Sequence, residues 1–471
     1  MVFLDTTVVT VALPRMGREL PAQLFGVLEG QSYVYNAYLL TLAALLVLAG
    51  AANDHYGRKR MFTLGIAGFG ATSVLCGLAP TMETLVLFRI LQGAAGALLV
   101  PSSLSLITAC FDDPVQRGRA FGLWSGASAA TTILGPVVGG ALVDLVSWRA
   151  AFLINVPFAL MALYAARPIR ESRDEQSTGA FDWLGSALSA VAVGGLSFGA
   201  IYGQQRDWRD PAAFVALAAG AAALLALPVW LRRARRPLVP LDLFRSRNFT
   251  VTNISTFLIY GALYVNIYYL TLFMQGVLGY TAAAAGLAGV PVSLFLVFFS
   301  SRVGALSGRF GPRAFMVAGP LIMAAGVLTW ALIPADAAAW KLGSGEPLPP
   351  ADYLTRILPG LVIFGIGLTL MVTPLVTALM ASVPVRNSGL ASAVNNAISR
   401  IGPQLVGAVI FVAINAATGV TELSDAARQA STDAFHIAML VSAGLLLAGA
   451  AVNLAIRNER VTQGAPEVAT P

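Results

Sequence analysis

The chain has 471 residues, of which 57% are hydrophobic and only 11% are charged, with a mean hydropathy of +0.75 and a formal net charge of +7. This balance excludes an ordinary soluble domain, in which about a quarter of the residues are charged. It predicts an all-α integral membrane protein, because apolar runs this long and continuous satisfy their backbone in lipid as helices rather than as barrel strands.

The first apolar run, from Met1 to Leu13, is short for a membrane span. We expect Pro14 to end this helix at the outer face, and about seven further residues would complete a span of about 30 Å. The natural protein is therefore expected to begin upstream of Met1, with helix 1 truncated here. Thirteen further spans are predicted near residues 31–52, 61–79, 85–109, 120–143, 150–166, 183–203, 212–230, 249–275, 281–301, 314–334, 354–380, 389–416 and 434–456.

These fourteen spans predict two bundles of six helices with two extra helices between them. An internal repeat supports the two bundles, because the stretches Gly50 to Gly57 and Gly304 to Gly311 share a seven-residue step between glycines. Each stretch lies between the second and third spans of its set of six, as parallel repeats require. The predicted division is 1–168 for the N-terminal bundle, 169–244 for the extra helices and their linkers, 245–457 for the C-terminal bundle and 458–471 for a disordered cytoplasmic tail.

About two thirds of the 30 Lys and Arg residues fall on one side of this topology, which the positive-inside rule makes cytoplasmic. Both termini are then expected in the cytoplasm, and the protein in the plasma (inner) membrane. The basic run from Arg232 to Arg236 is interpreted as a topology determinant rather than a specific lipid or nucleic-acid site. No nucleic-acid motif accompanies it, so membrane lipid is an expected partner and nucleic acid is not.

A short charged turn, Gly50 to Arg60, joins two of the apolar runs. Asp54 is suited to cap the following helix by accepting hydrogen bonds from its free backbone N–H groups, and Gly57 permits a sharp turn. Arg58 and Lys59 hold the turn at an anionic, cytoplasmic membrane face. An ordinary basic hairpin is the alternative interpretation.

Three stretches resemble motifs of the major facilitator superfamily. The turn at Gly50 resembles its loop G-x-L-A-D-R-x-G-R-K, although Ala52, Asn53 and His55 depart from the commonest residues. Arg89-Ile90-Leu91-Gln92-Gly93 resembles its R-x-x-Q-G motif, and Gly135-Pro136 with Gly139-Gly140 resembles the antiporter motif G-P-x-x-G-G. The resemblance implies a conformational gate, for which the candidate residues are Gly50, Asp54, Gly57, Arg58, Lys59, Gly135, Pro136, Gly139 and Gly140. Generic packing by small residues is the alternative for the last four.

Two further stretches narrow the resemblance to fourteen-span drug:proton antiporters of the EmrB/QacA-like branch. Leu4 to Pro14 is similar to L-D-x-T-x-V-N-V-A-L-P, with Thr10 in place of the usual Asn. Trp148 to Pro157 is similar to W-R-W-x-F-x-I-N-V-P. The resemblance covers essentially the whole chain and implies a major facilitator fold.

Asp5 is the candidate for proton coupling. It lies nine residues before Pro14, about 13 Å along a helix, and no other acid is predicted near the bilayer midplane. A lone carboxylate in a low-dielectric cavity resists ionisation, so we expect it to take up and release protons near physiological pH. The alternative is a structural hydrogen bond to Thr6, Thr7 or a neighbouring helix. Arg89 either assists proton coupling or locks the bundle by binding carbonyl groups.

The candidate substrate-binding residues are Gln92 and an aromatic face of the ninth span, formed by Phe257, Tyr260, Tyr264 and Tyr268. Flat lipophilic cations would bind such a face by stacking and cation–π contacts, while ordinary packing is the alternative.

Together these features predict a proton-coupled efflux transporter for multiple drugs or secondary metabolites that works by alternating access. We expect small amphipathic or cationic substrates, protons as the coupled ion, no cofactor, no metal and a monomer. A proton-coupled importer of peptides or small nutrients is a rival within transport. A membrane-embedded enzyme would need a nucleophile and base or a metal cluster, and a sensor would need a sizeable soluble domain. The sequence offers neither.

Overall fold

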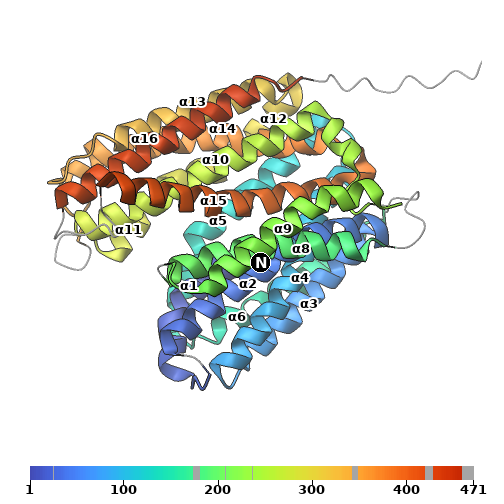
Figure 1. Ribbon diagram of the computed structural model, residues 1–471, viewed down its shortest axis with the longest axis horizontal. Helices are drawn as coiled ribbons and strands as arrows, with labels where there is room; N and C mark the ends of the chain where they lie inside the picture. Colours follow the sequence, from blue (N-terminus) through green and yellow to red (C-terminus); the bar gives the residue numbers. More distant parts are fainter. Residues whose placement is uncertain are drawn as a thin grey trace, which may run out of the picture.

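A computed structural model describes residues 1–24, 26–172, 181–206, 208–235, 237–341, 348–418 and 428–458 (Figure 1). No strand occurs among these residues. The expected tail, 458–471, lies outside the described residues apart from Asn458, and part of the first linker does too.

The helices before the middle of the chain are α1 (Val2–Glu19), α2 (Val27–Tyr56), α3 (Arg58–Gly77), α4 (Met82–Cys110), α5 (Pro114–Leu145), α6 (Ala150–Leu153), α7 (Asn155–Ala165), α8 (Trp183–Gln205) and α9 (Pro211–Arg233). Those that follow are α10 (Arg247–Leu272), α11 (Ala282–Ala288), α12 (Val290–Phe310), α13 (Arg313–Trp330), α14 (Leu358–Ala381), α15 (Ser388–Thr418) and α16 (Arg428–Asn453). Short 3-10 turns (Leu241–Arg245 and Val385–Asn387) and π turns (Phe273–Val277 and Tyr353–Ile357) lie beside them.

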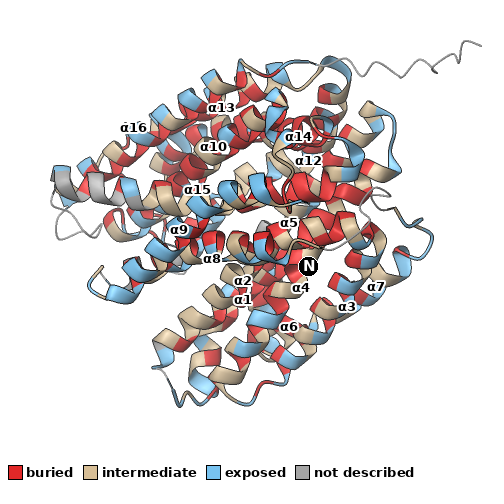
Figure 2. Cartoon of the chain, turned by 45° about the vertical axis from the view of Figure 1, so that its right-hand side comes forward, coloured by how far each residue is buried: buried red, intermediate tan, exposed pale blue. Residues whose placement is uncertain are grey.

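Within the described residues, ten helices are long and apolar enough to cross a membrane. The pair α6 and α7 forms a shorter apolar segment, Ala150–Ala165. Buried residues gather where the helices face one another, and exposed residues lie on outward faces and at helix ends (Figure 2). This is the pattern expected when helices pack side by side and lipid takes the place of water around them.

Helix contacts divide the chain into two groups. The first contains α2, α3 and α4 packed against one another, with α1 on α2 and α5 and with α7 on α3 (Figure 1). The second contains α10, α13, α14 and α16, with α12 on α14 and α15 on α10. The most extensive contacts between the groups are those of α5 with α12 and of α2 with α15. The helix α8 packs against α9 and α2 and also contacts α15, so the extra pair lies alongside both groups.

The predicted end of helix 1 at Pro14 is wrong. Pro14 lies inside α1, which continues to Glu19. Proline removes one backbone hydrogen bond, but membrane helices tolerate that loss where neighbouring helices hold the segment, as α2 and α5 do here. Asp5 therefore lies farther from the outer end of its helix than the position of Pro14 suggested.

Candidate functional site

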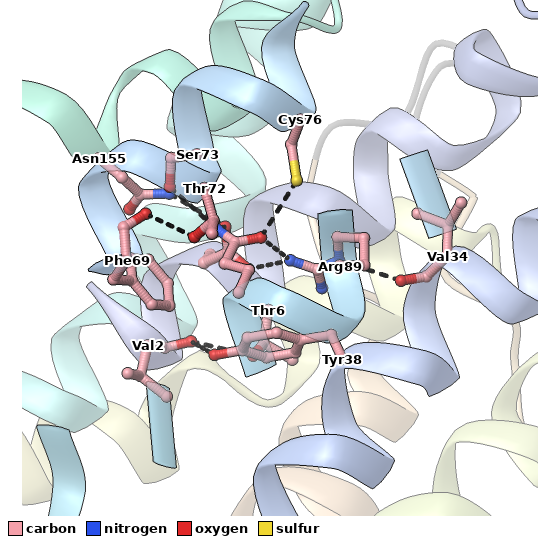
Figure 3. A network of polar contacts seen from close by, with 12 residues as sticks. Val2, Thr6, Val34, Tyr38, Phe69, Thr72, Ser73, Cys76, Arg89 and Asn155 are labelled. Atoms are coloured by element: carbon pink, nitrogen blue, oxygen red, sulfur yellow. Dashed lines mark hydrogen bonds and ion pairs between the residues drawn. The ribbon is translucent and has the colours of Figure 1, made fainter. Parts of the chain in front are cut away.

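A polar cluster is enclosed among the apolar helices of the first group (Figure 3). Its centre is Asp5 of α1, Arg89 and Gln92 of α4, and Asn155, the first residue of α7, and all four side chains have no exposed surface. Ser73 and Cys76 of α3 lie at its edge, as Figure 3 shows together with Arg89 and Asn155.

Asp5 accepts three hydrogen bonds from this cluster. Its Oδ2 accepts from Nη1 of Arg89 at 2.6 Å. Its Oδ1 accepts from Nε2 of Gln92 at 3.1 Å and from Nδ2 of Asn155 at 3.0 Å. All three partners donate, and one is a cation, so the site fits a charged carboxylate.

Arg89 is held from several sides. Its Nε donates to the carbonyl of Val34 on α2 at 3.0 Å, and Nη1 also donates to Oε1 of Gln92 at 2.7 Å. The guanidinium lies over the ring of Tyr38, 4.0 Å from the centroid, which adds a cation–π contact. Its Nη2 has no hydrogen-bond partner among the described residues.

The expectation of a lone carboxylate at Asp5 is therefore corrected to a buried ion pair. A charged pair away from water is retained only where its members neutralise and hydrogen-bond one another, and both conditions hold here. The sequence could not give this pairing, because the partners lie 84 residues apart and on different helices. Asn155 belongs to the quoted tryptophan-containing motif, but a neutral amide in an apolar run carried no separate signal.

The turn after α2 contacts the other group of helices. The prediction that Asp54 caps the following helix is wrong, because Asp54 lies inside α2 and its carboxylate reaches a different helix. It accepts from the backbone N–H of Gly389 at 3.1 Å and of Leu390 at 2.8 Å, both in the first turn of α15. Arg58 lies 3.4 Å from the Asp54 carboxylate and also donates to the carbonyl of Val385. A carboxylate at a helix N-terminus satisfies free N–H groups and the helix dipole, so this loop joins α2 to α15 by charge.

Glycines bring the two groups into close contact on the same side of the molecule. A Cβ at Gly50 would overlap the side chain of Ala393 on α15. A Cβ at Gly118 of α5 would overlap the carbonyl of Gly304 on α12, and one at Gly304 would overlap that of Gly118. Backbones this close leave no room for a side chain, so the contact between the groups depends on glycine.

Lys59 and Gly57 lie against a residue that the sequence did not single out. The carboxylate of Glu171 accepts from the backbone N–H of Lys59 at 3.0 Å and of Arg60 at 2.9 Å, at the start of α3. Gly57 has a φ of 109°, which favours glycine, and a Cβ there would lie 2.8 Å from the Glu171 carboxyl carbon. Glu171 thus fixes the turn from the linker after α7.

The four residues of the antiporter-like motif in α5, Gly135, Pro136, Gly139 and Gly140, lie in different surroundings. Gly135 would overlap Thr7 of α1 if it carried a Cβ, and at Gly139 a Cβ would lie 3.1 Å from Val8. At Gly140 a Cβ would have no atom within 4 Å. Pro136 lies inside α5, and its side chain is outside what the structure describes.

The candidate substrate residues are not brought together. Gln92 is enclosed in the polar cluster, where both ends of its amide are bonded. On α10, Tyr264 and Tyr268 are 53% and 61% exposed, whereas Phe257 and Tyr260 are partly buried against the core of the second group. Tyr264 and Tyr268 are thus accessible to a ligand, and Gln92 is not.

A helical membrane protein with two packed groups of spans and an ion pair enclosed in one of them has the build of a transporter. Comparison with known proteins identifies which. The family model of the Major Facilitator Superfamily matches residues 1–407 and 254–467. The chain belongs to this superfamily, which confirms the family that its motifs resemble.

Relatives and solved structures agree with this membership. The chain is 33% identical over 412 residues to the multidrug resistance protein Stp of Mycobacterium tuberculosis, covering 87% of this chain and 73% of that protein. It is 32% identical over 420 residues to the tetracenomycin C resistance and export protein of Streptomyces glaucescens, covering 89% and 74%. The proton:xylose symporter XylE has a similar fold, with a TM-score of 0.59, 16% identity and coverage of 94% of this chain and 91% of that one.

Proposed function

We propose that this protein exports amphipathic or cationic drugs or secondary metabolites in exchange for protons, by alternating access to the two faces of the membrane. Relatives named for drug resistance and for export support the efflux of such compounds. The observation that carries the proton coupling is the Asp5–Arg89 pair, fully buried inside a helix bundle. Ionisable residues inside a membrane are expensive and mark ion or substrate pathways.

Transport is coupled to protons because a proton and the Arg89 cation compete for the Asp5 carboxylate. When Asp5 is charged it binds Arg89, and when it takes a proton it releases that cation, so the packing of α1 on α4 depends on protonation. A proton crossing about 150 mV supplies about 3.5 kcal/mol, which sustains a gradient of some hundreds-fold for one uncharged substrate. Exchange of one proton for one monovalent cation moves no net charge, so the pH difference alone drives it. No cofactor is needed for this cycle.

We propose fourteen spans and membership of the EmrB/QacA-like branch. The ten long apolar helices, with α1, α5, α15 and the α6–α7 pair, account for fourteen crossings. The division into bundles at 1–168 and 245–457 with α8 and α9 between them fits the helix contacts. Both termini are then on one side, which the basic loops make the cytoplasm of a plasma membrane. We propose a monomer, because each bundle packs within the one chain.

The cytoplasmic ends of the bundles form the proposed gate. The contacts of Asp54 with α15, and of Gly118 with Gly304, join the bundles on the side where the basic turn lies. We propose that this arrangement is the outward-facing state, and that the gate opens when α2 leaves α15 and α5 leaves α12. Tyr264 and Tyr268 of α10 are the proposed contacts for flat cationic substrates.

Transport by Asp5→Asn tests the coupling. Asparagine keeps the size and hydrogen bonding of Asp5 but does not titrate, so in proteoliposomes we expect no uphill transport under a pH gradient, with drug binding retained. Uphill transport by this variant would place coupling elsewhere.

A panel of dyes and antibiotics on cells with and without the protein tests the direction of transport. Efflux predicts lower cellular content and higher resistance, whereas accumulation would indicate an importer.

A further inference from the structure

A buried carboxyl group that takes up and releases a proton needs hydrogen-bond partners in both states. The carboxylate only accepts, whereas the neutral acid must also donate its O–H. Around Asp5 the described partners, Arg89, Gln92 and Asn155, all donate. As the cluster stands, the O–H of a neutral Asp5 has no acceptor, and a buried O–H without an acceptor is costly. One partner must therefore change its orientation when the proton binds.

The two amides of the cluster differ in how firmly they are held. The carbonyl oxygen of Gln92 accepts from Arg89 at 2.7 Å and from the Cys76 thiol at 3.6 Å, and its NH₂ group donates to Ser73 at 2.8 Å as well as to Asp5. Turning Gln92 over would break all of these bonds. The bonds to Ser73 and Cys76 do not involve the ion pair, so they keep Gln92 in its orientation when the proton binds.

The side-chain amide of Asn155 makes one hydrogen bond, and its carbonyl oxygen makes none among the described residues. Its Nδ2 donates to Asp5, and its Oδ1 has no partner among the described residues although the side chain has no exposed surface. Turning this amide over breaks only the bond to Asp5 and brings a carbonyl oxygen to the same place. A buried carbonyl oxygen without a partner is costly, so its presence here calls for a reason.

We propose that Asn155 is the residue that adapts the cluster to the protonation of Asp5. Its Nδ2 donates to the carboxylate, and after a turn of the amide its Oδ1 accepts the O–H of the neutral acid. The proposal rests on the proposed function, because it requires Asp5 to titrate. Asn155 is a positioning residue, since it acts through Asp5.

Other charged or titratable groups also face Asp5. Arg89 does so from α4, Tyr38 from α2 and Cys76 from α3. Tyr38 donates to the carbonyl of Val2 and Cys76 donates to Gln92, so neither is hydrogen-bonded to the Asp5 carboxyl group, whereas Asn155 is.

Infrared difference spectra of the purified protein across a pH step test the proposal. In the wild-type protein we expect the C=O band of a neutral carboxyl group to appear on acidification, together with a change in an amide band that isotope-labelled asparagine identifies. Asp5→Asn should remove both signals. Asn155→Leu should keep the carboxyl band, move it to higher wavenumber because the O–H has lost its acceptor, and remove the amide change.

Transport gives a second readout. Neutral Asp5 in Asn155→Leu has an unpaired O–H, so pH-driven transport should fall about tenfold or more while substrate binding is unchanged. Asn453→Leu is a matched control, because Asn453 is equally buried, donates to the carbonyl of Met316 at 2.7 Å and has an Oδ1 without a described partner. Asn453→Leu should leave the carboxyl band and the amide change in place.

The outcomes separate this inference from the proposed function. If no carboxyl band is lost in Asp5→Asn, Asp5 does not titrate and the coupling proposal itself fails. If that band is lost but the labelled wild-type protein shows no asparagine change, Asp5 titrates without Asn155 and only the inference is overturned. A shift of the carboxyl band in Asn453→Leu equal to that in Asn155→Leu would also overturn it. The labelled wild-type spectrum decides even where Asn155→Leu does not fold.

Discussion

Asp5 and Arg89 form an ion pair between two side chains that have no exposed surface. Breaking such a pair by removing one member leaves the other charge buried without compensation. Replacing both members with neutral groups leaves no such charge. The stability of the bundle therefore depends on the pair being kept or lost as a unit.

Arg89→Gln should lower the free energy of unfolding by about 3–5 kcal/mol, because it leaves a buried carboxylate without its cation. Adding Asp5→Asn to this variant should restore part of the loss. Thermal unfolding in detergent measures both effects. Arg245→Gln is the control, since the Arg245–Asp242 pair is almost fully exposed and should not affect the unfolding temperature. Equal effects of Arg89→Gln and Arg245→Gln would contradict the argument.

At this scale the sequence identifies charges but not their partners. Asp5 and Arg89 are conspicuous because ionisable residues are rare in apolar runs, and both do lie inside the bundle. The bond between them and the part played by Asn155 depend on how α1, α4 and α7 pack. The sequence predicts that Gln92 binds substrate, because a polar side chain in an apolar run stands out. Its amide oxygen and nitrogen instead form hydrogen bonds within the cluster.

Among the helices, the contact of α2 with α15 combines a charged cap and a glycine crossing. Asp54 caps a helix that belongs to the other group, whereas carboxylates at helix starts normally cap their own helix. Gly308 occupies the position equivalent to Asp54 in the second copy of the loop, and a Cβ there would overlap the carbonyl of Pro114 on α5. The second contact is thus made by backbone approach without a carboxylate.

Asp54→Ala should shift the protein toward a state open to the cytoplasm, because it removes two charge-assisted hydrogen bonds to α15. We expect the open fraction to rise about tenfold or more, measured by distances between spin labels on the cytoplasmic ends of α2 and α15. Asp113→Ala is the control. Asp113 accepts from the N–H of Gln116 at 2.8 Å in its own helix, α5, and should leave that distance unchanged. An unchanged distance in Asp54→Ala would argue against the gate.

Helix boundaries show what hydropathy does and does not predict. Long apolar runs predict the positions of the ten helices that, among the described residues, are long and apolar enough to cross a membrane, since a span needs about 20 apolar residues. The interior position of Pro14 and the interruption at Ile154 between α6 and α7 were missed. Both are set by neighbouring helices that supply packing or polar partners, and a single run of sequence does not contain that information.

For the whole molecule, the contacts that Asp54 makes with α15 lie at the end of α2 that carries the basic turn. Arg58 and Glu171 hold the turn between α2 and α3 there, and the ion pair of Arg206 with Glu29 ties α8 to α2 at the opposite end of α2. In the proposed topology α8 and α9, both long and apolar enough to cross a membrane, add two crossings, so the second bundle keeps the same orientation with or without them. The charge of the loops then decides which side is cytoplasmic.

Reporters whose activity shows on which face of the membrane they lie should place the position after Arg457 in the cytoplasm. The same reporters should place Lys341 outside. The positions are separated by three predicted spans, so they must lie on opposite faces. Deleting Trp183–Arg233 removes α8 and α9 together and should leave the Arg457 reporter cytoplasmic, because an even number of crossings is lost. Deleting α9 alone removes one crossing and sets the basic loops of the second bundle against the positive-inside rule, so it should yield mixed reporter activity or loss of the protein. An Arg457 reporter that is active only outside in the intact chain would contradict both the fourteen-span count and the assignment of the gate to the cytoplasmic face.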